Sequence, residues 1–215
     1  MLRTSLALFA GILGFSAVSV PATARADVAE VVAPQAPPPP AEVATTRPPA
    51  WGARHPFSIG LRAPGRIGEG YAFGGVGGQV RLRPFERLRV DLFFDNFFGS
   101  SDMAMRHDHE VGTTLQFMIV STERFVLYPM LGACAMWAML TPGHDAPGVS
   151  DIRFGLHAGI GAEVALGSGF SVALNVEAVP YLGHEMRAYD RTAFVDNTLH
   201  VMPMGQANLG LNYWF

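Results

Sequence analysis

The chain has 215 residues, of which 49% are hydrophobic and only 15% are charged, and its formal net charge is −3. Ordinary soluble domains carry roughly 25% charged residues, so this chain has little charge with which to cover a soluble surface. The negative net charge argues against a nucleic-acid partner. The single cysteine excludes an intramolecular disulfide framework.

Residues 1–26 have the three-part organisation of a secretory signal peptide. Arg3 supplies the basic region, residues 6–20 are apolar, and Ala24 and Ala26 frame an A-x-A cleavage site. We therefore expect cleavage after Ala26 and export of the chain. An uncleaved N-terminal membrane anchor is the alternative interpretation.

Residues 27–54 form a second segment with a different composition. Seven prolines lie between residues 27 and 50, and four of them are consecutive at residues 37–40. This composition favours an extended polyproline conformation without a packed core. We expect a disordered periplasmic linker, which is either a spacer, a docking stretch or a tail without a partner.

From residue 55 to residue 215 the pattern changes to a period of two, which is typical of strands with two unlike faces. Three predicted connections are tight, whereas those at 64–70, 99–108, 141–150 and 182–200 are longer. Alternation of short turns and long loops predicts an outer-membrane β-barrel domain with both chain ends on the periplasmic side. The eight expected antiparallel strands are residues 55–63, 71–83, 87–98, 109–120, 124–140, 151–166, 170–181 and 201–215.

The two faces of these strands differ in charge as well as in hydrophobicity. One face is almost continuously apolar, and the other mixes small residues with arginines and acids in equal number. Buried ions are tolerated only when they are paired. We therefore predict that the apolar face contacts lipid and that the polar face forms a network in the lumen, which comprises Arg62, Arg81, Arg89, Asp91, Asp95, Arg153, His157, Glu163 and Glu177.

Aromatic residues near the strand ends predict two interfacial girdles. The girdle at the short-turn end would comprise Phe57, Phe125, Phe170 and Phe215, and the girdle at the long-loop end Tyr71, Phe97, Phe98, Trp137 and Tyr181. The facing of strand 124–140 stays open, because this strand is apolar on both sides.

Two stretches carry a family resemblance. FGLHAGIGAEVAL (154–166) and the C-terminal LGLNYWF (209–215) resemble the small eight-stranded outer-membrane barrels of the OmpA/OmpX-like group. The resemblance covers roughly residues 55–215. In that family the terminal aromatic residue and the alternating apolar residues before it form the signal that the assembly machinery reads. The resemblance thereby implies this role for Leu209, Leu211, Tyr213 and Phe215.

One motif suggests a metal. RHDHE (106–110) places two imidazoles and two carboxylates within five residues, and these groups suit zinc, copper or nickel. His107 and His109 would point the same way in a strand. A polar surface loop is the alternative. Because no complete ligand set accompanies them, we assign no metal and no cofactor and keep the two histidines as candidates.

The sequence also offers no complete catalytic set. His157 is expected to face the lumen with Glu163 and Arg153. Some outer-membrane barrels that deacylate or acylate lipid A use a lipid-facing His–Ser pair, but no serine here has a fitting spacing to such a histidine. We therefore predict no catalytic residue.

These expectations lead to a function without catalysis. The interior of an eight-stranded barrel is filled by side chains, so an open pore is not expected. We expect a monomer in the outer membrane of a Gram-negative bacterium, with a structural or surface-interaction role through loop 182–200. Its partners would be outer-membrane lipid or lipopolysaccharide and the assembly machinery. The alternatives are a lipid-modifying enzyme, a small-solute or metal-uptake barrel, and a soluble periplasmic barrel.

Overall fold

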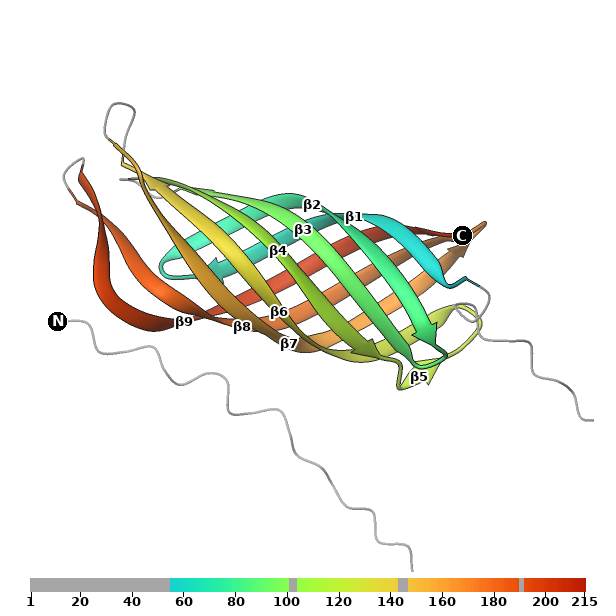
Figure 1. Cartoon of the computed structure of the whole chain (residues 1–215). Coiled ribbons are helices and arrows are strands. Elements are labelled where there is room, and N and C mark those ends of the chain that lie inside the picture. The colour runs from blue at the N-terminus through green and yellow to red at the C-terminus, as the bar shows by residue number, and fades with distance from the viewer. Residues whose placement is uncertain (1–54, 101–103, 143–146, 190–191) are drawn as a thin grey trace, which may run out of the picture. The chain divides into compact units, whose positions relative to one another are not determined.

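Eight long strands and one two-residue strand make up the described part of the chain (Figure 1). The computed structural model describes residues 55–100, 104–142, 147–189 and 192–215, so the predicted signal peptide and linker lie outside the described residues. The strands are β1 (Phe57–Gly68), β2 (Tyr71–Phe85), β3 (Leu88–Ser100), β4 (Met105–Phe117), β5 (Val120–Ser121), β6 (Phe125–Thr141), β7 (Val149–Gly167), β8 (Phe170–Tyr189) and β9 (Thr192–Trp214).

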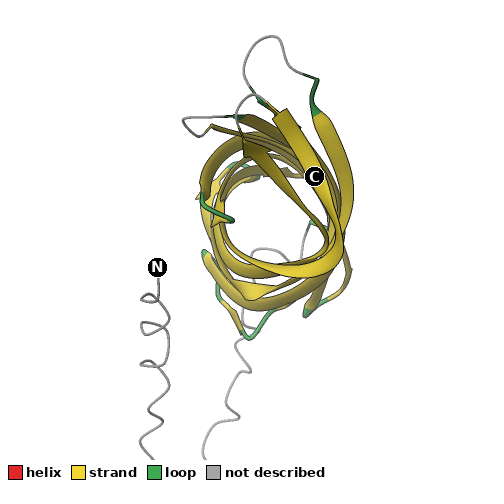
Figure 2. Cartoon of the chain, turned by 90° about the vertical axis from the view of Figure 1, so that its left-hand side faces the viewer, coloured by secondary structure: helices red, strands yellow, loops and turns green. Residues whose placement is uncertain are grey.

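The strands close into a barrel, which Figure 2 shows end-on as a ring. Each long strand pairs antiparallel with its neighbours, β1 pairs with β9, and β4 pairs with β6. The short strand β5 adds only to the edge of β6. This closure confirms the predicted eight-stranded antiparallel barrel. Among the described residues, no helix is long and apolar enough to cross a bilayer.

Three of the predicted long loops are wrong in whole or in part, and in one of them, 99–108, residues 99–100 belong to β3 and residues 105–108 to β4. Residues 64–68 continue β1, and the connection to β2 is a two-residue turn in which Glu69 and Gly70 have φ values of 50° and 80°. Positive φ at both central residues is the type I′ geometry that matches the twist of a hairpin. Residues 182–189 and 192–200 likewise continue β8 and β9. Pairing across each hairpin satisfies the backbone polar groups of these residues.

Along the barrel wall, side chains alternate between the interior and the exterior. On β8, Ala173 is 1% exposed and the adjacent Leu174 is 53% exposed. The same alternation resolves β6, where Tyr128 and Met136 point inward and Leu131 and Trp137 point outward. The exterior of the barrel is therefore a broad apolar surface.

The aromatic residues follow this alternation, which corrects the predicted girdle at the long-loop end. Phe98 and Trp137 are exposed, but Phe97 and Tyr181 are fully buried in the interior. Phe97 and Phe98 are consecutive, so a strand must place them on opposite faces. At the other end, the rings of Phe57 and Phe215 lie 5.6 Å apart on the outside, where the first and last strands meet.

Candidate functional site

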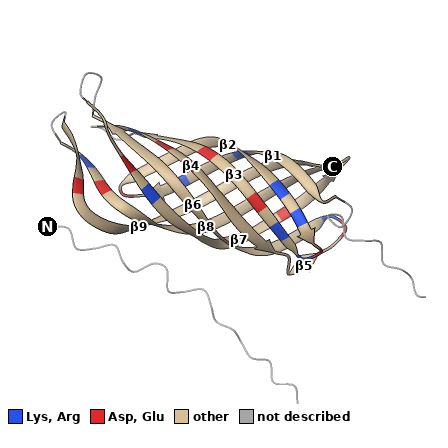
Figure 3. Ribbon diagram, viewed as in Figure 1, with Lys and Arg blue, Asp and Glu red and all other residues tan. Residues whose placement is uncertain are grey.

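The lumen is filled with charged and polar side chains. Charged positions gather in two groups along the barrel (Figure 3). The nine residues that the sequence placed in a lumen network are all buried, with at most 5% exposure: Arg62, Arg81, Arg89, Asp91, Asp95, Arg153, His157, Glu163 and Glu177. The structure does not join them into one network, and it adds further members.

Glu163 on β7 is the centre of the group near the chain ends. Its carboxylate pairs with Arg89 and with Arg81, the latter at 3.3 Å. Its other oxygen accepts hydrogen bonds from Ser171 and from Nε1 of Trp214, the latter at 3.0 Å. Arg81 also reaches Asp91 at 3.2 Å. One acid therefore ties β2, β3, β8 and β9 together at this end of the lumen.

Two predicted neighbours of Glu163 lie elsewhere. Arg153 pairs with Glu69 at 2.8 Å, and His157 pairs with Glu177 at 2.5 Å, so neither forms an ion pair with Glu163. All three predicted partners belong to β7. A strand rises about 3.3 Å per residue, so Arg153 and Glu163 are about 33 Å apart along the strand. A shared face does not place residues of one strand in contact.

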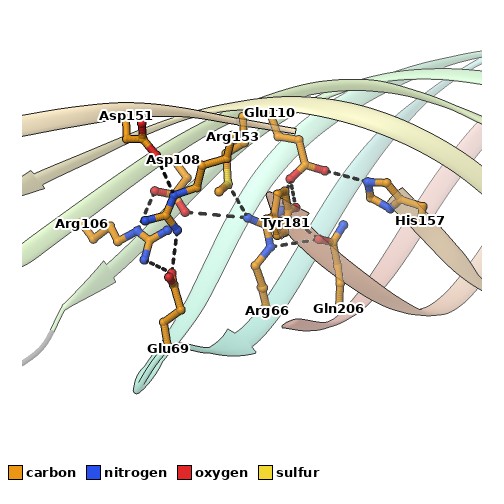
Figure 4. Close-up of polar contacts among 11 residues, drawn as sticks. Arg66, Glu69, Arg106, Asp108, Glu110, Asp151, Arg153, His157, Tyr181 and Gln206 are labelled. Carbon is orange, nitrogen blue, oxygen red and sulfur yellow. Dashed lines mark hydrogen bonds and ion pairs between the residues drawn. The ribbon is translucent and has the colours of Figure 1, made fainter. Parts of the chain in front are cut away.

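The second group of charges lies towards the opposite end of the lumen (Figure 4). Glu69, from the β1–β2 turn, accepts from both Arg153 and Arg106. Arg106 also donates to Asp108 at 2.9 Å. Sequence reasoning missed Glu69, Arg106 and Asp108 because it assigned residues 64–70 and 99–108 to loops. Continuing the two-residue alternation through 105–108 would have found Arg106 and Asp108, whereas Glu69 reaches the lumen from a turn, where the alternation does not apply.

A chain of polar contacts runs from this group towards the middle of the lumen. Arg66 pairs with Glu110 and lies 3.7 Å from Asp108. Tyr181 donates to the same oxygen of Glu110 at 2.5 Å. The other Glu110 oxygen faces His157 at 3.2 Å. Figure 4 shows Glu110 between these partners.

The histidines of the RHDHE motif lie on the outside of the barrel. His107 and His109 share one face of β4, whereas Asp108 and Glu110 point into the lumen. His109 Nδ1 is 2.6 Å from the side-chain oxygen of Asn96, and the His107 ring packs edge-on against Phe98. The strand therefore separates the imidazoles of this motif from its carboxylates.

Strands β8 and β9 extend beyond their neighbours as a hairpin, which we call the β8–β9 hairpin (residues 183–204). The pairing of β7 with β8 ends at Leu182, and the pairing of β1 with β9 ends at Gly205. Beyond these points β8 and β9 pair with each other, out to Tyr189 and Thr192. Figure 1 shows both strands running on at the end opposite the C-terminus.

The β8–β9 hairpin has one apolar buried face and one mixed exposed face. Met186 is buried against the core, together with Met202 and Met204. Tyr189 and Leu199 are 75% and 57% exposed. The hairpin thus presents aromatic and aliphatic groups beside charges at the rim.

Charged residues of the β8–β9 hairpin pair locally. Arg187 donates to Glu185 at 2.6 Å, and this hydrogen bond lowers the pKa of the Glu185 carboxyl. The backbone N–H of Thr198 donates to Asp196 and lowers the pKa of that carboxyl. Both acids are therefore ionised at neutral pH.

The predicted assembly signal lies on one outward face of β9. Leu209, Leu211, Tyr213 and Phe215 are all exposed on the exterior. Tyr213 packs edge-on against Phe215, with ring centroids 4.9 Å apart. These residues therefore form a continuous apolar and aromatic edge where the barrel closes.

Solved structures of outer-membrane proteins share this barrel geometry. Neisserial surface protein A (NspA) superposes with a TM-score of 0.52 at 11% identity, over 74% of this chain and 96% of that one. A major outer membrane protein from Thermus thermophilus gives 0.51 at 14% identity, over 75% and 100%. The chain has the fold of the small eight-stranded outer-membrane barrels. This confirms the predicted resemblance to OmpA/OmpX-like proteins at the level of the fold.

Sequence comparison adds no closer relationship. No protein-family model matches the chain, and no curated protein matches its sequence.

Proposed function

We propose that this chain is a non-enzymatic barrel of the Gram-negative outer membrane that presents the β8–β9 hairpin as an interaction surface outside the cell. The observation that carries the proposal is the distribution of polarity. Charges are buried in the lumen, a wide apolar exterior surrounds them, and one hairpin extends past the wall. This distribution suits a barrel that is embedded in lipid and recognises partners at one rim.

The filled lumen supports a structural role over uptake. Large side chains such as Arg81, Arg89, Tyr128 and Trp214 are fully buried inside the barrel. Small barrels of eight strands have an interior just wide enough for side chains to fill. The refolded protein should therefore show no stable conductance in a planar bilayer.

The proposed partners follow from the exposed groups. The apolar exterior would contact outer-membrane lipid, and the aromatic edge at Phe215 would be read by the assembly machinery. The exposed Tyr189, Phe194 and Leu199 would contact lipopolysaccharide or a protein at the cell surface. We propose a monomer, because closure of the barrel leaves no unpaired long strand among the described residues of the wall.

Labelling of intact cells tests the location and orientation together. The chain has one cysteine, Cys134, and it is buried. An Asn197→Cys variant places a thiol on the β8–β9 hairpin, and Glu86→Cys places one in the short β2–β3 turn. A membrane-impermeant maleimide should label Asn197→Cys on whole cells and Glu86→Cys only after the outer membrane is permeabilised. Labelling in the reverse order would contradict the proposed orientation, and recovery in the soluble periplasmic fraction would contradict the location.

Binding assays test the interaction role. A Tyr189→Ser/Phe194→Ser double variant removes two exposed aromatic groups without touching the lumen. Leu156→Ser, on the apolar exterior of β7, is the matched control for lost hydrophobicity. We expect the hairpin variant alone to reduce binding to immobilised lipopolysaccharide or to a cell-surface extract. Equal binding by both folded variants would remove the hairpin from the proposal.

A further inference from the structure

One cluster in the lumen combines sulfur, nitrogen and oxygen donors. Cys134 on β6, His157 on β7 and Glu110 on β4 each direct one such atom to the same point, and all three atoms lie within 4.8 Å of one another. All three residues are buried. Sequence reasoning missed this cluster because it considered the single cysteine only for disulfides and Glu110 only with its neighbours in the chain.

Two of these atoms face each other without a satisfactory hydrogen bond. Nε2 of His157 and Oε1 of Glu110 are 3.2 Å apart, and neither has a partner of acceptable hydrogen-bond geometry. Nδ1 of His157 lies 2.5 Å from a carboxylate oxygen of Glu177, where the ring nitrogen is the donor. In its neutral form the ring then turns the lone pair of Nε2 towards a carboxylate oxygen. Two facing lone pairs repel, so the position suits a cation between them, either the proton of an imidazolium or a metal ion that displaces that proton.

The remaining contacts hold the donors in place. Glu177 orients the imidazole in the carboxylate–histidine arrangement that supports metal ligands. Arg66 and Tyr181 both bind Oε2 of Glu110 and leave Oε1 free to point at the cluster. Cys134 pairs in register with Gly155 on the neighbouring strand, where an added Cβ would lie 2.7 Å from its sulfur. The glycine thus provides the room that the thiol occupies.

We propose that Glu110, Cys134 and His157 form a binding site for Zn²⁺ in the lumen. Zinc binds thiolate, imidazole and carboxylate at about 2.0–2.3 Å, so a nitrogen and an oxygen on one tetrahedral ion are about 3.3–3.5 Å apart. The separation of 3.2 Å between His157 and Glu110 is already close to this value. The sulfur lies within 4.8 Å of the other two donor atoms, so it needs to approach by at most about 1 Å, and a water completes four-fold coordination.

The charges of the cluster also suit a divalent cation. Metal binding converts Cys134 to a thiolate and requires the neutral form of His157 at Nε2, so protons leave as the ion enters. The thiolate, Glu110 and Glu177 then supply three negative charges, and Arg66 supplies one positive charge. In the loaded site these groups sum to −2, which a divalent ion neutralises.

Cobalt substitution tests the site directly. The full mature chain is refolded into detergent micelles with Co²⁺ present, because the filled lumen leaves metal little access afterwards. A thiolate-to-cobalt charge-transfer band is expected, and it can arise only from Cys134, since the chain has one cysteine. Zn²⁺ added during refolding should abolish the band and remain bound, with about one ion per chain after washing with chelator. Absence of the band from folded wild-type protein would overturn the proposal and leave a protonated His157 between Glu110 and Glu177.

Variants assign the ligands. Cys134→Ser should remove the band, and His157→Gln should reduce Zn²⁺ retention at least tenfold. His109→Gln on the outer surface and His200→Gln, which breaks the exposed Glu185–Asp196–His200 cluster, should leave both signals unchanged. Retention of Zn²⁺ by folded His157→Gln, or its loss in His200→Gln, would place the metal elsewhere. Should a lumen variant fail to fold, the wild-type cobalt band still decides the question.

Discussion

Trp214, next to the end of the chain, donates a hydrogen bond from its indole nitrogen to Oε1 of Glu163 on β7, at a distance of 3.0 Å. The last strand is thereby joined to the interior charges, while the adjacent Tyr213 and Phe215 lie on the outer surface. Alternation along β9 thus places Trp214 in the lumen and places Tyr213 and Phe215 on the exterior. The barrel therefore closes beside the group of buried charges around Glu163.

Replacing Glu163 should be strongly destabilising. Glu163→Gln removes the negative charge that Arg81 and Arg89 share, and both guanidinium groups are buried. Removing one partner of a buried ion pair costs about 3–5 kcal/mol. Urea unfolding from lipid vesicles measures this change. Glu86→Gln in the exposed β2–β3 turn is the control, and equal stability of the two variants would contradict the assigned role of Glu163.

The pairing of Glu163 can be separated from that of Arg153 by double-mutant cycles. Glu163 contacts Arg89, whereas Arg153 contacts Glu69. We expect an interaction energy above about 0.5 kcal/mol for Glu163 with Arg89, and additivity within about 0.5 kcal/mol for Glu163 with Arg153. The unfolding free energies of the single and double alanine variants provide both numbers. Coupling in the second cycle alone would mean that the charges of the lumen are arranged differently.

The exterior of β8 should behave as a lipid-facing surface. Leu174 is exposed between other apolar residues, and Leu174→Arg should lower the free energy of unfolding by about 2–4 kcal/mol at the bilayer midplane. Ala173→Arg points into the filled lumen and should prevent folding by steric crowding. Folding yield into vesicles and equilibrium unfolding measure the two effects. A neutral Leu174→Arg would require the two faces to be exchanged.

Deleting Phe215 should affect assembly more than stability. The residue is 56% exposed, and its contacts are a backbone hydrogen bond to Phe57 and packing on two aromatic rings. We expect a large loss of outer-membrane protein in cells and a small change in the stability of barrel refolded in detergent. Immunoblots of membrane fractions and thermal unfolding give the comparison. Equal losses in both would assign Phe215 to packing, and unchanged levels in cells would remove the signal role.

Much of the barrel follows from the chain by itself, because a strand has a strict period of two. Neighbouring residues such as Ala173 and Leu174 must occupy opposite faces, so alternating polarity predicts which side faces outward. The same rule predicts the strand number and the antiparallel order, since tight turns join consecutive strands. The loops predicted at 64–70, 99–108 and 182–200 were wrong because the strands continue into all three segments.

Contacts between strands depend on register and closure, which only the tertiary structure decides. Arg153 and Glu163 share a strand and a face but are separated along the barrel, whereas Trp214 and Glu163 are 51 residues apart and in contact. Glu110, Cys134 and His157 come from three strands and meet because β4 pairs with β6 and β6 with β7 in one particular register. The chain alone determined which side chains enter the lumen, and the pairing of its strands determined which of them meet there.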